Sequence, residues 1–195
     1  MAVKLKSRVI KPSNSGLLEE VINRLHFERA LIMETERQKA LNYLSETNIT
    51  FNIVEHPPVY TIEDMENLHI DDNNQVVKNL FVRDDKKKRY FLVSVQKDKR
   101  VDLKELRIKL DSGKLSFASE TDLKEILGLD KGAVTPLGIL NDENCRVEVV
   151  LDNDIKCFNT IGIHPNDNTA TIWVSPKDLE TAVKKKGNTF YYVEI

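Results

Sequence analysis

The chain has 195 residues, of which 41% are hydrophobic and 31% charged, and its formal net charge is −2. These values are typical of a soluble globular protein with a sizeable core, and no apolar run reaches the roughly 20 residues that span a bilayer. The charge argues against a protein that coats nucleic acid electrostatically, and two cysteines exclude a disulfide framework. Because residues 1–12 also lack the apolar core of a secretory signal, we expect a cytoplasmic protein.

Residues 17–47 have the apolar spacing of helices, and a charged centre near residues 34–37 predicts two helices rather than one. The second helix is expected to end near Thr47 and Asn48, where residues that favour turns begin. We expect residues 1–35 to form an N-terminal helical extension and residues 36–195 to form the main domain.

The pattern then changes to strands. Residues 51–54 alternate, and residues 75–82 and 90–95 predict a hairpin whose loop contains Asp84, Asp85 and a lysine run. Amphipathic helices are expected at 102–110 and 121–127. For the second of these we expect Thr121 as N-cap, no capping box, and Gly128 as the stop.

Further strands are predicted at residues 146–151, 157–163, 170–174 and 189–193. A last helix opens at Ser175-Pro176, with serine at the cap and proline in the first turn, and ends at Gly187. Helices and strands alternate irregularly rather than as βαβ repeats. The sequence therefore predicts an α+β fold with a mixed, largely antiparallel sheet flanked by helices.

Common catalytic signatures are absent from the sequence. It has no Gly-x-Ser-x-Gly elbow, phosphate-binding loop or dinucleotide fingerprint. The four histidines lie far apart, and Cys145 and Cys157 lack flanking ligand pairs, so we expect neither a metal nor a cofactor. What remains is a site built from positioning, hydrogen bonds and one lysine.

Three segments are candidates for that site, each with a purely structural alternative. Lys78 interrupts an apolar strand, so it either points into a polar cleft or faces water at a sheet edge. Residues 132–138 hold small residues and a proline, which expose backbone groups to a ligand or form an ordinary turn. His164 ends an apolar strand before a polar turn, where it can contact a substrate or cap the turn.

Two basic runs, residues 86–89 and 184–186, can contact phosphates. Their structural alternatives are a solvated turn and a helix C-terminus, which the helix dipole favours.

Together and in this order, these segments resemble the YbaK-like family of aminoacyl-tRNA editing domains, and within it the free-standing ProX type that removes alanine from proline tRNA. The resemblance covers roughly residues 37–195. It rests on four motifs: Glu55-His56-Pro57-Pro58-Val59-Tyr60-Thr61-Ile62-Glu63, Lys78-Asn79-Leu80-Phe81, Gly132 to Pro136, and Gly162-Ile163-His164-Pro165 with Asn168-Thr169-Ala170-Thr171.

The resemblance implies a hydrolase that deacylates mischarged alanyl-tRNA(Pro), releasing alanine and free tRNA without a cofactor. It implies that Lys78 holds the terminal phosphate or supports charge, that the Gly132 backbone positions water or the amino group, and that His164 lines the pocket. It further implies a substrate-binding set of Ala133, Val134, Thr135, Pro136, Gly162 and Asn168.

The partner implied is the acceptor 3′ end of a mischarged tRNA, with prolyl-tRNA synthetase as a second candidate and no membrane. Two alternatives stay open: a cysteinyl-tRNA(Pro) deacylase of the YbaK type, and a non-catalytic module that binds tRNA or an amino acid. A generic interaction domain explains none of the four motifs. The sequence gives no oligomeric state.

Overall fold

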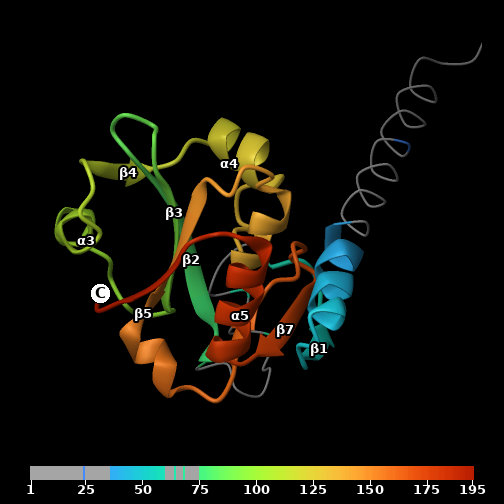
Figure 1. Ribbon diagram of the computed structural model, residues 1–195. Helices are drawn as coiled ribbons and strands as arrows, with labels where there is room; N and C mark the ends of the chain where they lie inside the picture. The colour runs from blue at the N-terminus through green and yellow to red at the C-terminus, as the bar shows by residue number, and fades with distance from the viewer. Residues whose placement is uncertain (1–23, 25–35, 60–63, 65–67, 69–74) are drawn as a thin grey trace, which may run out of the picture.

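The N-terminal helix of the described structure belongs to the main core. The computed structural model describes residues 24, 36–59, 64, 68 and 75–195, so the predicted first helix, apart from residue 24, lies outside the described residues. Residues 36–46 are helical and end in a turn at Thr47 and Asn48, as expected. Ala40 and Leu44 of this helix are fully buried, and the helix packs on the body of the protein (Figure 1).

The larger sheet has five strands in the order β4-β2-β3-β5-β8. Strands β2 and β3 form the predicted antiparallel hairpin, and β4 adds antiparallel to β2, whereas β5 and β8 add parallel to β3 and to each other. Asp84 ends β2 rather than lying in the loop. The strands are β2 (Val77–Asp84), β3 (Tyr90–Gln96), β4 (Leu115–Phe117), β5 (Val147–Asp152) and β8 (Phe190–Val193).

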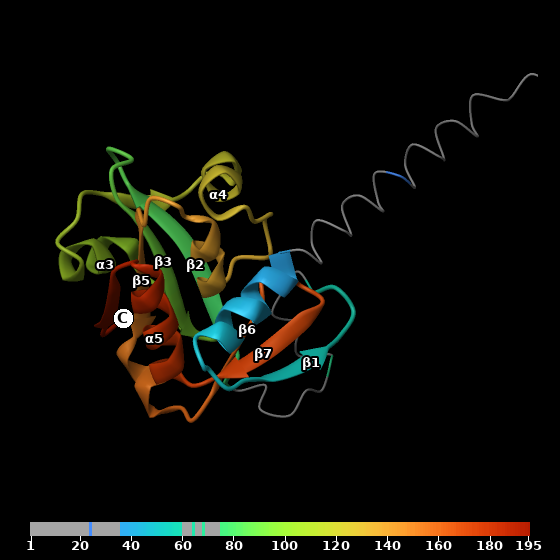
Figure 2. The same cartoon turned by 45° about the vertical axis from the view of Figure 1, so that its right-hand side comes forward.

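The smaller sheet is antiparallel, with the order β1-β7-β6. Its strands are β1 (Asn52–Glu55), β7 (Ala170–Val174) and β6 (Ile161–Ile163). One parallel bridge, between Val76 and Gly162, joins the start of β2 to β6. The N-terminal end of β2 therefore lies at the junction of the two sheets (Figure 2).

Apolar side chains pack on both faces of the larger sheet. Alternate residues of β2 and β3 point to opposite faces, and this divides the core into two clusters. Val77, Phe81 and Leu92 pack with helices α4 (Glu120–Leu127) and α5 (Pro176–Lys186) and with the helix at 36–46. Val82 and Phe91 pack with helix α3 (Leu103–Lys109) on the other face. The architecture is α+β with mixed sheets, as predicted.

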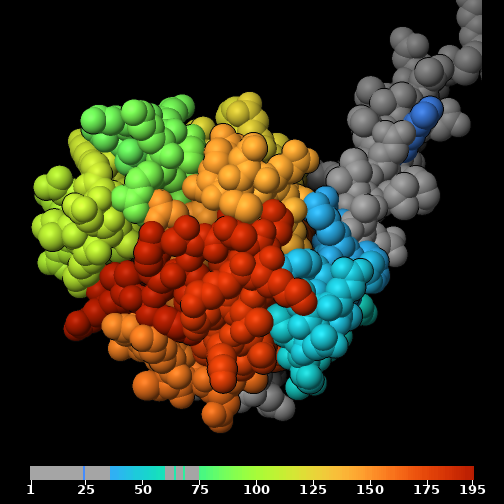
Figure 3. Space-filling view, viewed as in Figure 1, coloured from blue at the N-terminus to red at the C-terminus, as the bar shows by residue number. Residues whose placement is uncertain are grey.

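The last helix follows the sequence prediction. Ser175 caps α5 by accepting a hydrogen bond from the backbone of Asp178, and Gly187 ends it in the left-handed conformation, with φ 104°. Tyr43 donates a 2.8 Å hydrogen bond to the carbonyl of Ala182, which holds the helix at 36–46 beside α5 (Figure 3). None of the helices in the described part of the chain is long and apolar enough to cross a membrane.

Residues 86–88 of the first basic run lie in a solvated turn, and the second basic run lies at a helix C-terminus. Residues 86–88 are exposed in the turn of the β2–β3 hairpin, and residues 184–186 form the last turn of α5. Lys87 pairs with Asp122 at 3.9 Å, and Lys184 pairs with Glu180 along the helix. Neighbouring carboxylates thus offset part of each positive run.

The predicted start of α4 is wrong. Its N-cap is Ser119 rather than Thr121, and a capping box is present. The Ser119 hydroxyl accepts from the Asp122 backbone at 3.0 Å, and the Asp122 carboxylate accepts from the Ser119 backbone at 3.1 Å. The prediction required glutamate or glutamine at the third helical position, but the shorter aspartate serves here. Gly128 ends the helix with φ 67°, as expected.

The strand predicted at 157–163 is only partly correct. Residues 161–163 form β6, whereas Asn153–Cys157 form a short 3-10 helix, η3. The side chain of Asp152 caps that helix by accepting from the backbone of Asp154. Of the predicted strand, η3 takes only Cys157, and residues 158–160 form neither helix nor strand. Strand β4, three residues long, was not predicted.

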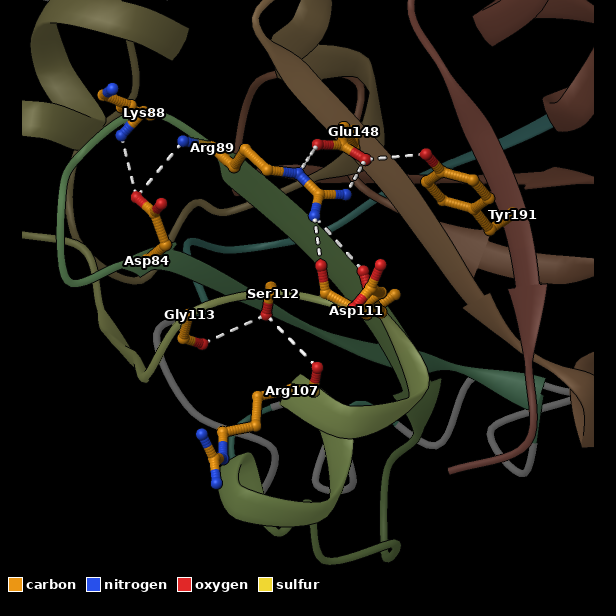
Figure 4. Close-up of polar contacts among 10 residues, drawn as sticks. Asp84, Lys88, Arg89, Arg107, Asp111, Ser112, Gly113, Glu148 and Tyr191 are labelled. Atoms are coloured by element: carbon orange, nitrogen blue, oxygen red, sulfur yellow. Dashed lines mark hydrogen bonds and ion pairs between the residues drawn. The ribbon is translucent and has the colours of Figure 1, made fainter.

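Arg89 holds the segment after α3 against the larger sheet (Figure 4). Its guanidinium makes a bidentate pair with Glu148 at 2.7 and 2.8 Å and donates to the carbonyls of Leu110 and Asp111. Tyr191 donates to the same Glu148 carboxylate at 2.8 Å. This network adds side-chain contacts to the pairing of β3, β5 and β8, and it ties the end of α3 to these strands.

Candidate active site

Strand β2 carries two polar residues, Lys78 and Asn79, at the junction of the sheets. Val77 and Phe81 flank Asn79 on the face that packs toward α4 and α5, so Asn79 shares that face and Lys78 leaves the strand on the opposite one. Lys78 is half-buried, and no ion pair or hydrogen bond reaches its ammonium from the part of the chain that the structure describes.

Asn79 is the β2 side chain that reaches the glycine loop. Its Nδ2 donates a 3.1 Å hydrogen bond to the carbonyl of Val134. Its Oδ1 accepts a 2.6 Å hydrogen bond from the hydroxyl of Ser94 on β3. The amide thus joins two central strands to a loop that is 55 residues away along the chain.

The loop at 132–136 is fixed on one side and exposed on the other. Gly132 has φ 88°, a conformation that favours glycine, and it is exposed. Ala133, Thr135 and Pro136 are buried, and Pro136 opens the 3-10 helix η2 (Pro136–Asn141). Within residues 132–136, Gly132 is therefore the most exposed residue.

His164 lies beside this loop, directly after β6. The Thr135 hydroxyl donates a 2.5 Å hydrogen bond to the backbone carbonyl of His164. The Nδ1 of His164 lies 3.1 Å from the carbonyl of Ala170. Because a carbonyl can only accept, the proton of the neutral ring sits on Nδ1 and Nε2 keeps its lone pair.

The surroundings of His164 favour its neutral form. Burial lowers its pKa below the usual 6.5, although the hydrogen bond to Ala170 acts in the opposite direction, and the neighbouring charge of His56 lowers the pKa further. The two imidazole rings meet edge to face with their centroids 6.3 Å apart. A neutral His164 offers Nε2 as a hydrogen-bond acceptor to a ligand.

His56 is a site residue that the sequence patterns did not single out. Its Nδ1 lies 2.8 Å from the carbonyl of Pro57, and its Nε2 lies 3.0 Å from the hydroxyl of Thr171. Because the Pro57 carbonyl can only accept, Nδ1 is the donor there, and Nε2 shares a hydrogen bond with the Thr171 hydroxyl. The Glu-His-Pro-Pro motif was the sequence feature that could have identified His56. The spacing along the chain did not predict that His56 lies beside His164.

The turn between β6 and β7 is closed by its own side chains. The Asp167 carboxylate accepts 2.8 Å hydrogen bonds from the backbone and the hydroxyl of Thr169. Asn168, expected to bind substrate, is buried, and its Nδ2 donates to the carbonyl of Val59 at 3.1 Å. Asn168 therefore ties the His56 segment to the histidine turn.

Gly162 has a packing reason to be glycine. A methyl group at this position would come within 3.0 Å of the Trp173 ring. Trp173 is buried with Val59 and Val76, beside the bridge that joins the two sheets. The missing side chain at Gly162 lets β6 approach β7 and the start of β2.

The structure thus brings together the three segments that the sequence predicted, although they are far apart in the chain. Asn79 contacts the glycine loop, and the glycine loop contacts the histidine turn. The side chain that makes the first contact is Asn79 and not Lys78. Among the described residues, no group of three histidine, cysteine or acidic side chains is arranged to hold a metal ion.

The chain belongs to the aminoacyl-tRNA editing domain family, whose model matches residues 56–182. This match contains the lysine strand, the glycine loop and the histidine turn. The predicted family is therefore confirmed, and with it the enzyme class: an editing deacylase, a hydrolase that acts on mischarged tRNA.

Relatives point to the prolyl-tRNA branch of this family. The chain is 48% identical to the prolyl-tRNA editing protein ProX of Acetoanaerobium sticklandii, a match that covers 82% of this chain and 97% of that protein. It is 37% identical to the prolyl-tRNA synthetase associated domain-containing protein 1 of Xenopus laevis, over 78% of this chain and 92% of that protein.

A solved structure supports the fold. A protein described as a candidate trans-editing enzyme for prolyl-tRNA synthetase superposes with a TM-score of 0.64, covering 82% of this chain and 97% of that chain. The two chains are only 20% identical, so this likeness concerns the α+β architecture alone. It confirms the predicted fold class.

Proposed function

We propose that this chain is a trans-editing deacylase that hydrolyses alanyl-tRNA(Pro) to alanine and free tRNA. The observation that carries the proposal is the pair of hydrogen bonds from Asn79 to Val134 and from Thr135 to His164. These bonds hold the lysine strand, the glycine loop and the histidine turn in one site. The similarity to a prolyl-tRNA editing protein at 48% identity supports the tRNA class.

Hydrolysis of this ester needs little covalent chemistry from the protein. An aminoacyl ester is already labile, so the main requirements are an oriented water and stabilisation of the developing oxyanion. The exposed backbone of Gly132 supplies an N–H group for that oxyanion or for the water. The free hydroxyl of the terminal ribose assists the attack, so no protein general base is required.

His164 and Lys78 bind different parts of the substrate, the aminoacyl group and the terminal phosphate. A neutral His164 accepts a hydrogen bond at Nε2 from the substrate ammonium or from the water, and it lines the pocket. Lys78 is a half-buried cation at the sheet junction, on the face of β2 opposite Asn79, and it holds the phosphate of the terminal nucleotide. Residues 133–136, Gly162 and Asn168 shape the remainder of the substrate site, mostly through backbone and buried side chains.

Discrimination against proline is a problem of size. A difference of one or two methylene groups is worth only about 1–3 kcal/mol in an apolar pocket. A separate site that admits only small side chains provides a second sieve after aminoacylation. We therefore propose mischarged tRNA as the partner, in the cytoplasm, with prolyl-tRNA synthetase as the enzyme whose errors are corrected.

The test is a hydrolysis screen with tRNA(Pro) carrying alanine, cysteine, serine or proline. We expect alanyl-tRNA(Pro) to be deacylated fastest and prolyl-tRNA(Pro) to survive. Faster loss of cysteine than of alanine would select the cysteinyl-tRNA alternative instead. Tight tRNA binding without hydrolysis of any of the four esters would select the non-catalytic module.

A further inference from the structure

Ser94 is a polar residue in the middle of the apolar strand β3. It is fully buried, as are its neighbours Val93 and Val95. In the β2–β3 pairing it lies directly opposite Asn79, and its hydroxyl donates a 2.6 Å hydrogen bond to Asn79 Oδ1. A buried hydroxyl without a partner costs free energy, so this position requires the hydrogen bond that Asn79 provides.

This hydrogen bond fixes which way the Asn79 amide points. The carbonyl of Val134 can only accept, so the Asn79 nitrogen must face it and the Asn79 oxygen must face β3. There the Ser94 hydroxyl satisfies the oxygen. With the amide reversed, the Asn79 and Val134 oxygens would face each other and the loop would be pushed away.

The consequences extend to the other parts of the site. Val134 lies two residues after Gly132 and next to Thr135, whose hydroxyl holds the backbone of His164. Hydrogen bonds of Ser94, Asn79 and Thr135, linked through the backbone at Val134, therefore run from the centre of the larger sheet to the histidine turn.

We propose that Ser94 is a positioning residue of the editing site. It acts through Asn79 to fix the glycine loop, and so sets where the Gly132 backbone meets the reacting ester. It does not touch the substrate. The inference rests on the proposed function only where deacylation is the readout.

The first test is kinetic. In Ser94→Ala we expect kcat for alanyl-tRNA(Pro) to fall about tenfold with KM within about twofold, because the loop is misplaced while most binding contacts stay. Ser94→Thr keeps the hydroxyl and should recover most of the rate. Ser116→Ala, on the half-buried Ser116 of β4, is the matched control and should keep the parental kcat. If Ser94→Ala does not fold, Ser94→Cys, with similar size and a weaker donor, takes its place.

A double-mutant cycle separates positioning from general packing. If Ser94 acts through Asn79, the double variant Ser94→Ala with Asn79→Ala has the same kcat as Asn79→Ala alone. If Ser94 only fills the core, the two losses multiply. Multiplied losses, or a parental kcat in Ser94→Ala, would overturn the proposal.

An NMR measurement does not depend on the reaction. In ¹⁵N-labelled protein, Ser94→Ala should shift the amide resonances of Gly132, Ala133 and Val134, whereas Ser116→Ala should leave them unchanged. Unshifted loop resonances refute the role of Ser94. Shifted resonances in a protein that hydrolyses no mischarged tRNA refute the proposed function and leave the positioning role standing.

Discussion

At the scale of single residues, the proposed mechanism depends on Lys78. Lys78 lies half-buried at the junction of two sheets, without an ion pair or hydrogen bond to the described residues. We expect Lys78→Ala to abolish deacylation and to leave the melting temperature within a few degrees, since no hydrogen bond or ion pair to the described residues is lost. Lys86→Ala, in the exposed hairpin turn, is the control. Parental hydrolysis by Lys78→Ala would remove Lys78 from the mechanism.

His164 gives the site a predictable pH dependence. Its pKa lies below 6.5 because of burial and the neighbouring His56, so the neutral ring persists into mildly acidic solution. We expect kcat/KM to fall only as the pH drops through this lowered pKa. As the pH falls, the His164 ring binds a proton at a higher pH in the unfolded chain than in the folded protein. The contribution of His164 to stability is therefore lost as the pH falls below about 6.5.

His56→Gln tests the coupling between the two rings. It removes a neighbouring positive charge, so the pKa of His164 should rise and the acidic limb of the kcat/KM profile should move to higher pH. An NMR titration of the His164 ring in both proteins measures the same change directly. A limb that stays in place, or moves to lower pH, would show that His56 does not control the ionisation of His164.

At the scale of secondary-structure elements, Arg89 attaches the end of α3 to the larger sheet. Its planar guanidinium meets Glu148 at two points and also reaches two backbone carbonyls, a pattern that lysine cannot reproduce. We expect Arg89→Lys to lower the free energy of unfolding by about 1–3 kcal/mol, measured by urea denaturation, with deacylation unchanged. Arg107→Lys, which lies outside this network (Figure 4), should have no effect on either quantity.

Sequence patterns predict elements well where the signal is local. The caps Ser175 and Gly187, and the hairpin around residues 85–89, follow from residues that are adjacent in the chain. The patterns fail for β4, which has three residues and is defined by its pairing with β2, and for the N-cap Ser119, whose aspartate partner is shorter than the pattern requires.

The prediction of the candidate site has the same limit: local patterns identify its segments but not the contacts between them. Lys78, Gly132 and His164 are predicted as segments because each carries an unusual residue in an apolar or small-residue context. The contact made by Asn79 cannot be predicted, since the face of β2 that meets the loop is set by packing across 55 residues. The sequence does not identify Ser94 for a related reason: a single serine in an apolar run forms no periodic pattern.

At the scale of the whole molecule, the burial of the helix at residues 36–46 indicates where the domain begins. Its Leu44 is fully buried in the main core. We expect Leu44→Ala to lower the free energy of unfolding by about 2–5 kcal/mol, and the exposed Glu46→Ala, on the same helix, to change it little. Denaturant titrations of both variants measure this difference.

The boundary itself is tested by shortening the chain. If residues 1–35 are an extension, a chain that begins at residue 36 keeps the melting temperature and the deacylation rate of the full chain. A chain that begins at residue 48 lacks Ala40 and Leu44 and should not fold cooperatively. Loss of cooperative unfolding already at residue 36 would place the boundary nearer the N-terminus.

Trp173 gives this protein a built-in optical reporter. It is the one tryptophan of the chain, so its emission is not mixed with that of other indoles. The ring lies against Gly162, two residues before His164, and is almost fully shielded from water. Its emission wavelength and quenching can therefore follow the binding of an uncleavable aminoacyl nucleotide without labels, in the same cuvette that records unfolding.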